Sequence, residues 1–209
     1  MMLRKKLAEF LGRGRRVDAA TLLVEGRMPA LDSAGPWLNS APLAAADLAG
    51  RVVLIDFWTY SCINCLRTLP HLQAWHEAYG KTGLTIIGVH TPEFDFEKET
   101  INVQRAAERH GLTYPIVLDN DYVLWNRYRN RCWPAHYFID AGGNIRYRHF
   151  GEGDYAHSEE IIRTLLAEAG KIPPAEPVHL AEPTLACAGQ LTPETYLGFD
   201  RVEYLGSPE

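Results

Sequence analysis

The sequence predicts an α/β fold with a mixed central sheet and helices on both of its faces. Residues 51–58 and 84–90 are near-continuous apolar runs, typical of strands buried on both faces, and a segment with helical spacing lies between them. Residues 135–140 and 144–150 flank the turn sequence AGGN and indicate an antiparallel hairpin. A parallel strand–helix–strand unit joined to a hairpin places parallel and antiparallel neighbours in one sheet.

The strand–helix–strand unit over residues 51–90 comes first. Its helix, predicted over 62–79, follows from apolar residues at helical spacing: Ile63, Leu66, Leu69, Leu72 and Trp75. We expect Ser61 to cap the amino end of this helix and Gly80 to end it. The two strands should pair in parallel through a right-handed crossover.

An inserted helix–strand unit, a short helix, the hairpin and a closing helix complete the domain. The expected ranges are a helix over 97–110, ended by Gly111, a strand over 115–118, a helix over 122–128 and the closing helix over 158–169. Glu159 and Glu160 would lie near the positive end of the closing helix. Residues 27–50 are punctuated by proline and indicate a connecting segment with one turn of helix at 43–48.

The chain divides into a basic extension at 1–24, a folded domain at 25–170, and a Pro-rich linker with an acidic tail at 171–209. The extension has a short apolar helical face, which would suit contact with a membrane surface or a partner. A frayed or body-packed terminal helix is the favoured interpretation. No transmembrane span and no secretory signal can be read from the sequence.

Charge and cysteine usage exclude two classes of protein. The 209 residues contain 21 Lys and Arg against 26 Asp and Glu, a net charge of -5, which argues against a nucleic-acid binder. The four cysteines, at positions 62, 65, 132 and 187, are too few and too unevenly spaced for a disulfide-stapled secreted scaffold. The close pair therefore points to redox or metal chemistry.

Cys62 and Cys65 are placed where a buried strand turns into a helix. A thiolate in the first turn meets unpaired backbone N–H groups and the positive end of the helix dipole, which lower its pKa. The second cysteine, one turn further, can close a small disulfide ring, and such a dithiol exchanges disulfides with a substrate. The alternative is two buried cysteines acting as small apolar residues; the strand-to-helix context favours the redox interpretation.

The segment VVLIDFWTYSCINCLRTLP resembles the active-site strand and helix of thioredoxin-fold oxidoreductases. Asp56 stands six residues before Cys62, Trp58 four before it and Pro70 eight after it. These are the positions where that family carries its buried acid, its active-site tryptophan and its helix-kinking proline.

Further motifs extend the resemblance over residues 25–170. Trp133 and Pro134, directly before AHYFID, resemble the family's cis-proline loop, which faces the dithiol and holds the substrate chain. The inserted unit between residues 91 and 118, with SCINC, NRCWPAHYFID and GEGDY, is similar more specifically to the TlpA/DipZ branch. The resemblance implies a thioredoxin-like fold, a thiol–disulfide oxidoreductase and no cofactor or metal.

The resemblance also implies a role for each residue of the redox-active pair. Cys62 would attack the substrate disulfide and Cys65 would resolve the mixed disulfide. Asp56, on a strand too apolar to solvate a carboxylate well, would take the proton of Cys65 or return it. The alternative for Asp56 is a buried acid satisfied by local hydrogen bonds.

Substrate contacts and direction of electron flow follow from the same comparison. Trp58, Trp133 and Pro134 would border the substrate groove, although each tryptophan could instead be core packing. Ile63 and Asn64 stand where oxidants and isomerases carry a pair that ends in His. Without that His one device for stabilising the reduced thiolate is missing, which favours a reductant.

Two other functions use the same residues. A thiol peroxidase would need a Thr beside its cysteine and a Pro-rich loop before it; Thr59 is present, but the proline is not. A metal carrier would use Cys62 and Cys65 with Cys132 or His136. Coordination of a metal ion would occupy the redox sulfurs, so an isolated thiol is the favoured interpretation of Cys132. Because Cys132 precedes Trp133, we expect it to lie near the dithiol.

The expected partners are protein disulfides or dithiols, and the resemblance adds a membrane thiol carrier as electron donor. The lack of a readable secretory signal favours a location in the cytoplasm, whereas the resemblance favours the extracytoplasmic face of a bacterial membrane. The tail TPETYLGFDRVEYLGSPE, which includes no cysteine, is similar to the phrase that leads DipZ-like proteins into a β-rich module. The chain is then either a fragment of a longer protein or carries a tail that folds back on the domain. The sequence around Cys187 does not suggest a partner for this cysteine.

Overall fold

The computed structural model describes residues 22–32, 34–178 and 180. The sequence-based expectations for the basic extension before residue 22, for Cys187 and for the acidic tail lie outside these residues. The division at 25, 170 and 171 therefore stays a prediction. Within the described ranges, no helix combines the length and the apolar character needed to cross a bilayer.

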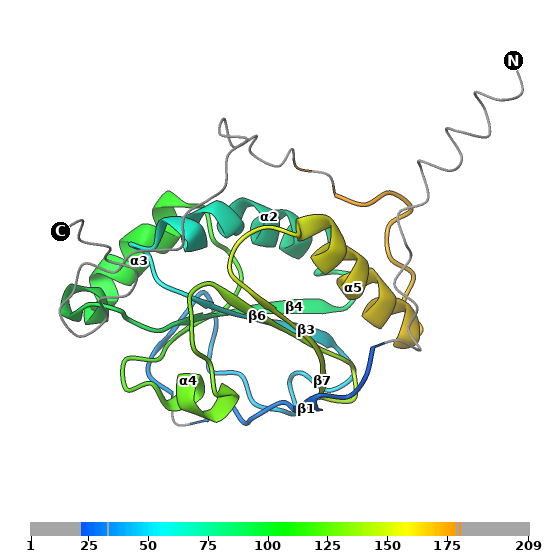
Figure 1. Ribbon diagram of the computed structural model, residues 1–209, viewed down its shortest axis with the longest axis horizontal. Helices are drawn as coiled ribbons and strands as arrows, with labels where there is room; N and C mark the ends of the chain where they lie inside the picture. The colour runs from blue at the N-terminus through cyan, green and yellow to red at the C-terminus, as the bar shows by residue number, and fades with distance from the viewer. Residues whose placement is uncertain (1–21, 33, 179, 181–209) are drawn as a thin grey trace, which may run out of the picture.

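A seven-stranded mixed sheet forms the centre of the described chain, in the order β1-β7-β6-β3-β4-β5-β2 (Figure 1). The strands are β1 (Gly26–Arg27), β2 (Trp37–Leu38), β3 (Val52–Trp58), β4 (Leu84–His90), β5 (Ile116–Leu118), β6 (Ala135–Ile139) and β7 (Asn144–Phe150). β3 pairs in parallel with β4 and antiparallel with β6, which in turn pairs with β7. The predicted mixed sheet is confirmed.

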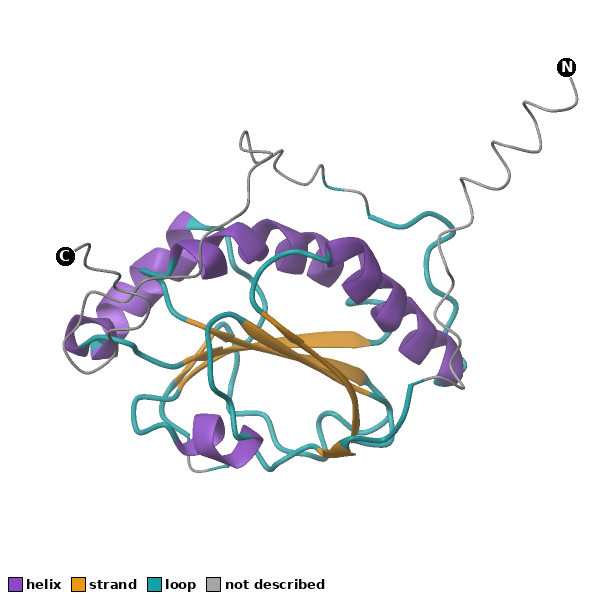
Figure 2. Cartoon of the chain, viewed as in Figure 1, coloured by secondary structure: helices purple, strands orange, loops and turns teal. Residues whose placement is uncertain are grey.

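Helices cover both faces of this sheet, as predicted. α2 (Ile63–Tyr79), α3 (Thr100–Arg109) and α5 (Tyr155–Glu168) lie over one face, and the short α4 (Val123–Tyr128) lies over the other (Figure 2). A 3-10 helix, η2 (Asp95–Lys98), precedes α3 in the inserted unit. The two faces of β3 belong to separate apolar clusters: Leu54 and Trp58 pack under α2 and α5, whereas Ile55 and Phe57 pack on the side of α4. Every residue of β3 is buried, which explains why its sequence is apolar except at Asp56.

Local boundaries differ from the sequence-based expectation at four places. The connecting segment contributes β1 and β2, which pair with β7 and β5 at the two edges of the sheet. α3 starts at Thr100 because the preceding residues form η2. α5 starts at Tyr155, so Glu159 lies in its second turn and is buried rather than facing the positive helix end. The N-cap residue of α2 also differs, because it is Cys62 and not the expected Ser61.

Candidate active site

Cys62 and Cys65 lie where β3 ends and α2 begins. Cys62 is the N-cap residue of α2, and its sulfur accepts the backbone N–H of Cys65 at 3.4 Å. Cys62 is half-buried, whereas Cys65, inside the first turn, is fully buried; both carry free thiols. The expectation that Ser61 caps this helix is wrong, because the Ser61 hydroxyl donates to Glu97 Oε1 at 2.5 Å instead.

The acidities of the two thiols move in opposite directions. A hydrogen bond from the Cys65 thiol lowers the pKa of Cys62, and backbone N–H groups of Cys65 and Asn64 add to this effect. Burial and the Glu93 carboxylate oppose the shift without reversing it. Burial is the largest cause that raises the pKa of Cys65 well above its ordinary value, followed by the neighbouring Cys62 and, more weakly, Asp56. The pair therefore favours a Cys62 thiolate beside a protonated Cys65.

Asp56 lies in the middle of β3, on the face covered by α2. Its side chain is fully buried, and neither carboxylate oxygen has a hydrogen-bond partner among the described residues. Its register partners are Gly88 on β4 and His136 on β6. His136 Nε2 lies 3.3 Å from Asp56 Oδ1, close enough for an ion pair but without hydrogen-bond geometry. The alternative interpretation, in which local hydrogen bonds satisfy the Asp56 carboxylate, does not agree with the structure.

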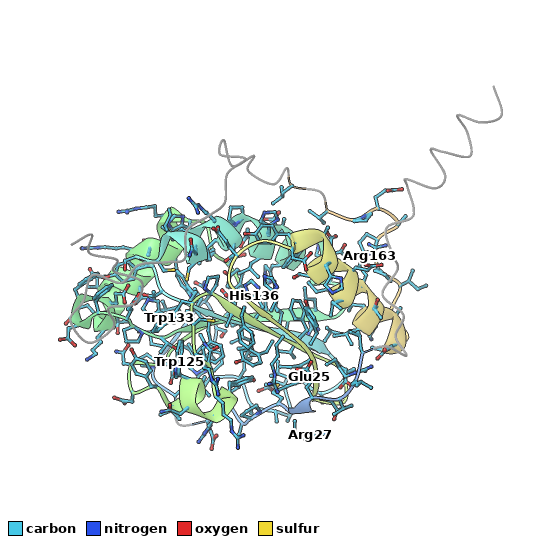
Figure 3. All side chains as sticks on the ribbon, viewed as in Figure 1. Glu25, Arg27, Trp125, Trp133, His136 and Arg163 are labelled. Carbon is cyan, nitrogen blue, oxygen red and sulfur yellow. The ribbon has the colours of Figure 1, made fainter. Side chains whose placement is uncertain are left out.

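Trp133 and Pro134 form the loop before β6, and the peptide bond between them is cis. The indole Nε1 of Trp133 donates to the carbonyl oxygen of Thr91 at 3.0 Å, and its ring packs on Trp125 with centroids 4.2 Å apart (Figure 3). Pro134 is buried, while Trp133 is half-buried and packs, like Cys62, against the cluster under α2 and α5. Trp133 therefore contacts the core cluster that Cys62 also contacts, and through Trp125 it reaches the other cluster as well.

His90, at the end of β4, is enclosed by the three residues that follow Phe57. Trp58 meets its ring edge-on at 5.2 Å, Tyr60 stacks on it at 5.7 Å, and Thr59 Oγ1 lies 3.4 Å from its Nε2. Burial lowers the pKa of His90 to about 4. Trp58 and Thr59 are both fully buried. Of the two alternatives for Trp58, its burial favours core packing over the border of a substrate groove. Thr59 faces His90.

Glu97 is a buried acid next to the dithiol that sequence reasoning did not single out. Besides the Ser61 hydroxyl, it accepts the backbone N–H groups of Glu93 at 2.5 Å and Phe94 at 2.9 Å. Burial works against its ionisation, but the hydrogen bonds from Ser61, from Thr59 and from the backbone outweigh it and lower the pKa of Glu97. An ionised carboxylate therefore joins the inserted unit to the residue before Cys62.

Cys132 packs against the cluster on the α4 side of the sheet, whereas Cys62 packs against the other cluster. Because the two residues pack against different clusters and Trp133 contacts both sides through Trp125, the expected proximity of Cys132 to the dithiol stays a prediction. Over the described ranges, no group of three or more His, Cys, Asp or Glu side chains is placed to hold a metal ion.

The AhpC/TSA sequence profile matches residues 28–148, more than half of the chain. The chain belongs to the AhpC/TSA family. Among its relatives, the Protein DipZ of Mycobacterium tuberculosis is 48% identical over 194 residues, covering 90% of this chain and 28% of that protein. The chain thus spans about a quarter of the DipZ length. The thiol-disulfide oxidoreductase YkuV of Bacillus subtilis is 28% identical over 141 residues, covering 68% of this chain and 95% of YkuV.

Solved structures place this AhpC/TSA member among thioredoxin-like folds. A thioredoxin-like protein in the oxidized form superposes with a TM-score of 0.61 and 28% identity, over 68% of this chain and 97% of that one. The thioredoxin-like superfamily protein SPOA0173 gives a TM-score of 0.63 at 25% identity, over 71% and 99%. The predicted thioredoxin-like fold and the DipZ-like resemblance are confirmed.

Proposed function

We propose that this protein exchanges disulfides with protein substrates through a Cys62 and Cys65 dithiol. One observation carries the proposal: two sulfurs three residues apart differ in depth and in acidity, with the accessible one favoured as thiolate and the buried one held protonated. The accessible thiolate suits attack on a substrate, and the buried thiol is kept in reserve for the second step.

The reaction then proceeds in two exchanges. The Cys62 thiolate attacks one substrate sulfur, forms a mixed disulfide and releases the other substrate sulfur as thiolate. Cys65 next loses its proton to the Asp56 carboxylate and attacks Cys62 Sγ, which releases the second substrate thiolate and leaves a Cys62–Cys65 disulfide. Two electrons pass to the substrate. Trp133 and Pro134, beside the same core cluster as Cys62, are proposed to hold the substrate chain.

We further propose that the protein works as a reductant, with a membrane thiol carrier as the donor that restores the dithiol. The pair Ile63 and Asn64 lacks the His of strong oxidants, and burial together with the Glu93 carboxylate limits how far the Cys62 thiolate is stabilised. A less stabilised thiolate gives a more reducing couple.

Reduction of insulin by the dithiol form tests this function. We expect Cys62→Ser to abolish turnover, Cys65→Ser to stop after one mixed disulfide, and the matched control Cys132→Ser to keep wild-type activity. Equilibration with glutathione should place the couple nearer to about -270 mV than to about -120 mV. Full activity in Cys62→Ser would refute the dithiol, and a potential at the oxidising end would refute the reductant role.

A further inference from the structure

Three titratable side chains form a row across three neighbouring strands. Asp56 on β3 is the register partner of His136 on β6, and His136 is the register partner of His149 on β7. Leu54 and Trp58, two residues to either side of Asp56, pack with Cys65 under α2. Since alternate residues of a strand share a face, the row lies on the face that carries the dithiol.

The row leads from the interior towards the surface. Asp56 is 0% exposed and His136 1% exposed, while His149, on β7, is half-buried. His136 Nε2 lies 3.3 Å from Asp56 Oδ1, and the rings of His136 and His149 are nearly parallel at 18° with centroids 6.0 Å apart. The first separation allows direct proton exchange after a small rotation, and the second is short enough for one water to bridge.

Most polar atoms of this row lack a hydrogen bond; the exception is the His149 ring, which also bonds to the backbone of Gly151 and Glu152. Both oxygens of Asp56, both ring nitrogens of His136 and Nε2 of His149 are buried and make no hydrogen bond to described residues. Buried polar groups are nearly always paired, because leaving each one unpaired costs about 1–3 kcal/mol. Three such groups in register beside a redox thiol indicate a function that outweighs this cost.

We propose that His136 and His149 form a proton path from Asp56 to solvent, with His136 as a positioning residue for the resolving step of Cys65. This inference rests on the proposed dithiol function. When the Cys65 thiol gives its proton to Asp56, the carboxylic acid passes a proton to Nε2 of His136, and the other ring nitrogen releases one towards His149 and solvent. The carboxylate is restored, one proton leaves, and no electron moves along the path.

Other titratable groups face the row from each neighbouring element. Cys65 faces Asp56 from α2, and Tyr114 faces it from the segment before β5. Asp154, at the start of α5, acts electrostatically on His149. None of them replaces His136, because it alone lies in register between Asp56 on β3 and His149 on β7.

The test separates the two thiol steps with an aromatic disulfide, dithiobis(nitrobenzoate). Attack by Cys62 releases a first aromatic thiolate, and displacement by Cys65 releases a second one. In His136→Gln, which hydrogen-bonds but does not titrate, we expect an unchanged first phase and a second phase slowed ~10-fold at neutral pH. The two proteins should converge only above the ordinary thiol range, where Cys65, whose pKa burial raises, ionises without the path.

His149→Gln should slow the second phase in the same pH-dependent way, and its matched control is His157→Gln, another half-buried histidine, which packs on Tyr147. If His136→Gln does not fold, the comparison of His149→Gln with His157→Gln decides the question. A second phase with the wild-type rate and pH profile in the folded variants would overturn the proton path. A second release that persists in Cys65→Ser would instead overturn the dithiol function itself.

Discussion

Replacing Glu97 by Gln removes one negative charge from the contact between the inserted unit and the loop before Cys62. Three of the hydrogen bonds to this carboxylate come from the Ser61 hydroxyl and from the backbone N–H groups of Glu93 and Phe94, and Thr59 supplies another. Bonds to a charged acceptor contribute about 1.5–3 kcal/mol each, and neutral ones about 0.5–1.5 kcal/mol. A loss of about 1 kcal/mol in each of three bonds predicts a free energy of unfolding lower by ~3 kcal/mol.

Thermal and urea unfolding at neutral pH measure this loss. For a chain of this size, ~3 kcal/mol corresponds to a Tm lower by about 6–12 °C. Because the folded-state pKa of Glu97 is lowered, its contribution is complete above the unfolded-state value of about 4.3 and is lost as pH falls through the lower folded-state value. Wild type and Glu97→Gln should therefore approach each other in acid.

Asp95→Asn is the matched control on the same 3-10 helix. Asp95 forms an exposed ion pair with Lys98 at 2.7 Å, and solvent screens such a pair. We expect the unfolding free energy of Asp95→Asn to stay close to that of wild type. Equal stability of Glu97→Gln and wild type at neutral pH, or a difference that grows in acid, would contradict the reasoning.

Two further predictions concern the layer beneath the dithiol loop. Because the pKa of His90 is lowered to about 4, the unfolded chain binds more protons than the folded one between that pH and about 6.5. The free energy of unfolding should therefore fall by up to roughly 3 kcal/mol as pH drops through this window. Urea unfolding at several pH values measures this fall, which should be absent in His90→Phe. In Gly88→Ala the new Cβ would lie 3.0 Å from Trp58 Nε1, which predicts a loss of about 1–3 kcal/mol in thermal unfolding; in the control Gly26→Ala the nearest atom is 4.0 Å away, and little change is expected. An unfolding free energy of wild type that does not change with pH would contradict the His90 prediction. Equal losses of stability in Gly88→Ala and Gly26→Ala would contradict the Gly88 prediction.

The elements that could be predicted from sequence are those whose burial is visible in a local period. β3 and β4 lie at the centre of the sheet, so both of their faces are largely apolar and each run is nearly continuous. β1 and β2 consist of two residues each, too few to show an alternating pattern, and only their pairing with the sheet edges defines them.

The caps could not be predicted because distant residues decide them. Ser61 has the better intrinsic preference for an N-cap, but Glu97, 36 residues further along the chain, accepts its hydroxyl and leaves the cap to Cys62. α5 begins after Asp154, which has a left-handed backbone and makes no side-chain cap bond, so no cap preference marks that start.

The candidate site divides in the same way. Cys62, Cys65 and Asp56 fall within ten residues and could be read as one motif. His136 lies 80 residues beyond Asp56, and only the pairing of β3 with β6 brings the two side chains within 3.3 Å. A histidine on the apolar face of a predicted strand was the available signal, but its partner depends on strand order, which the sequence left open.

The inserted unit does more than extend the sheet, because three of its contacts end on the loop that carries Cys62. The Tyr60 hydroxyl donates to the carbonyl oxygen of Phe96 at 3.0 Å, Ser61 donates to Glu97, and the Glu93 carboxylate raises the pKa of Cys62 against the hydrogen bonds that lower it. The same unit therefore holds the cysteine in place and moderates its acidity. The insertion therefore acts mainly on the geometry of the dithiol loop, because the Glu93 charge is the smallest influence on the acidity of Cys62 and its pKa is lowered overall.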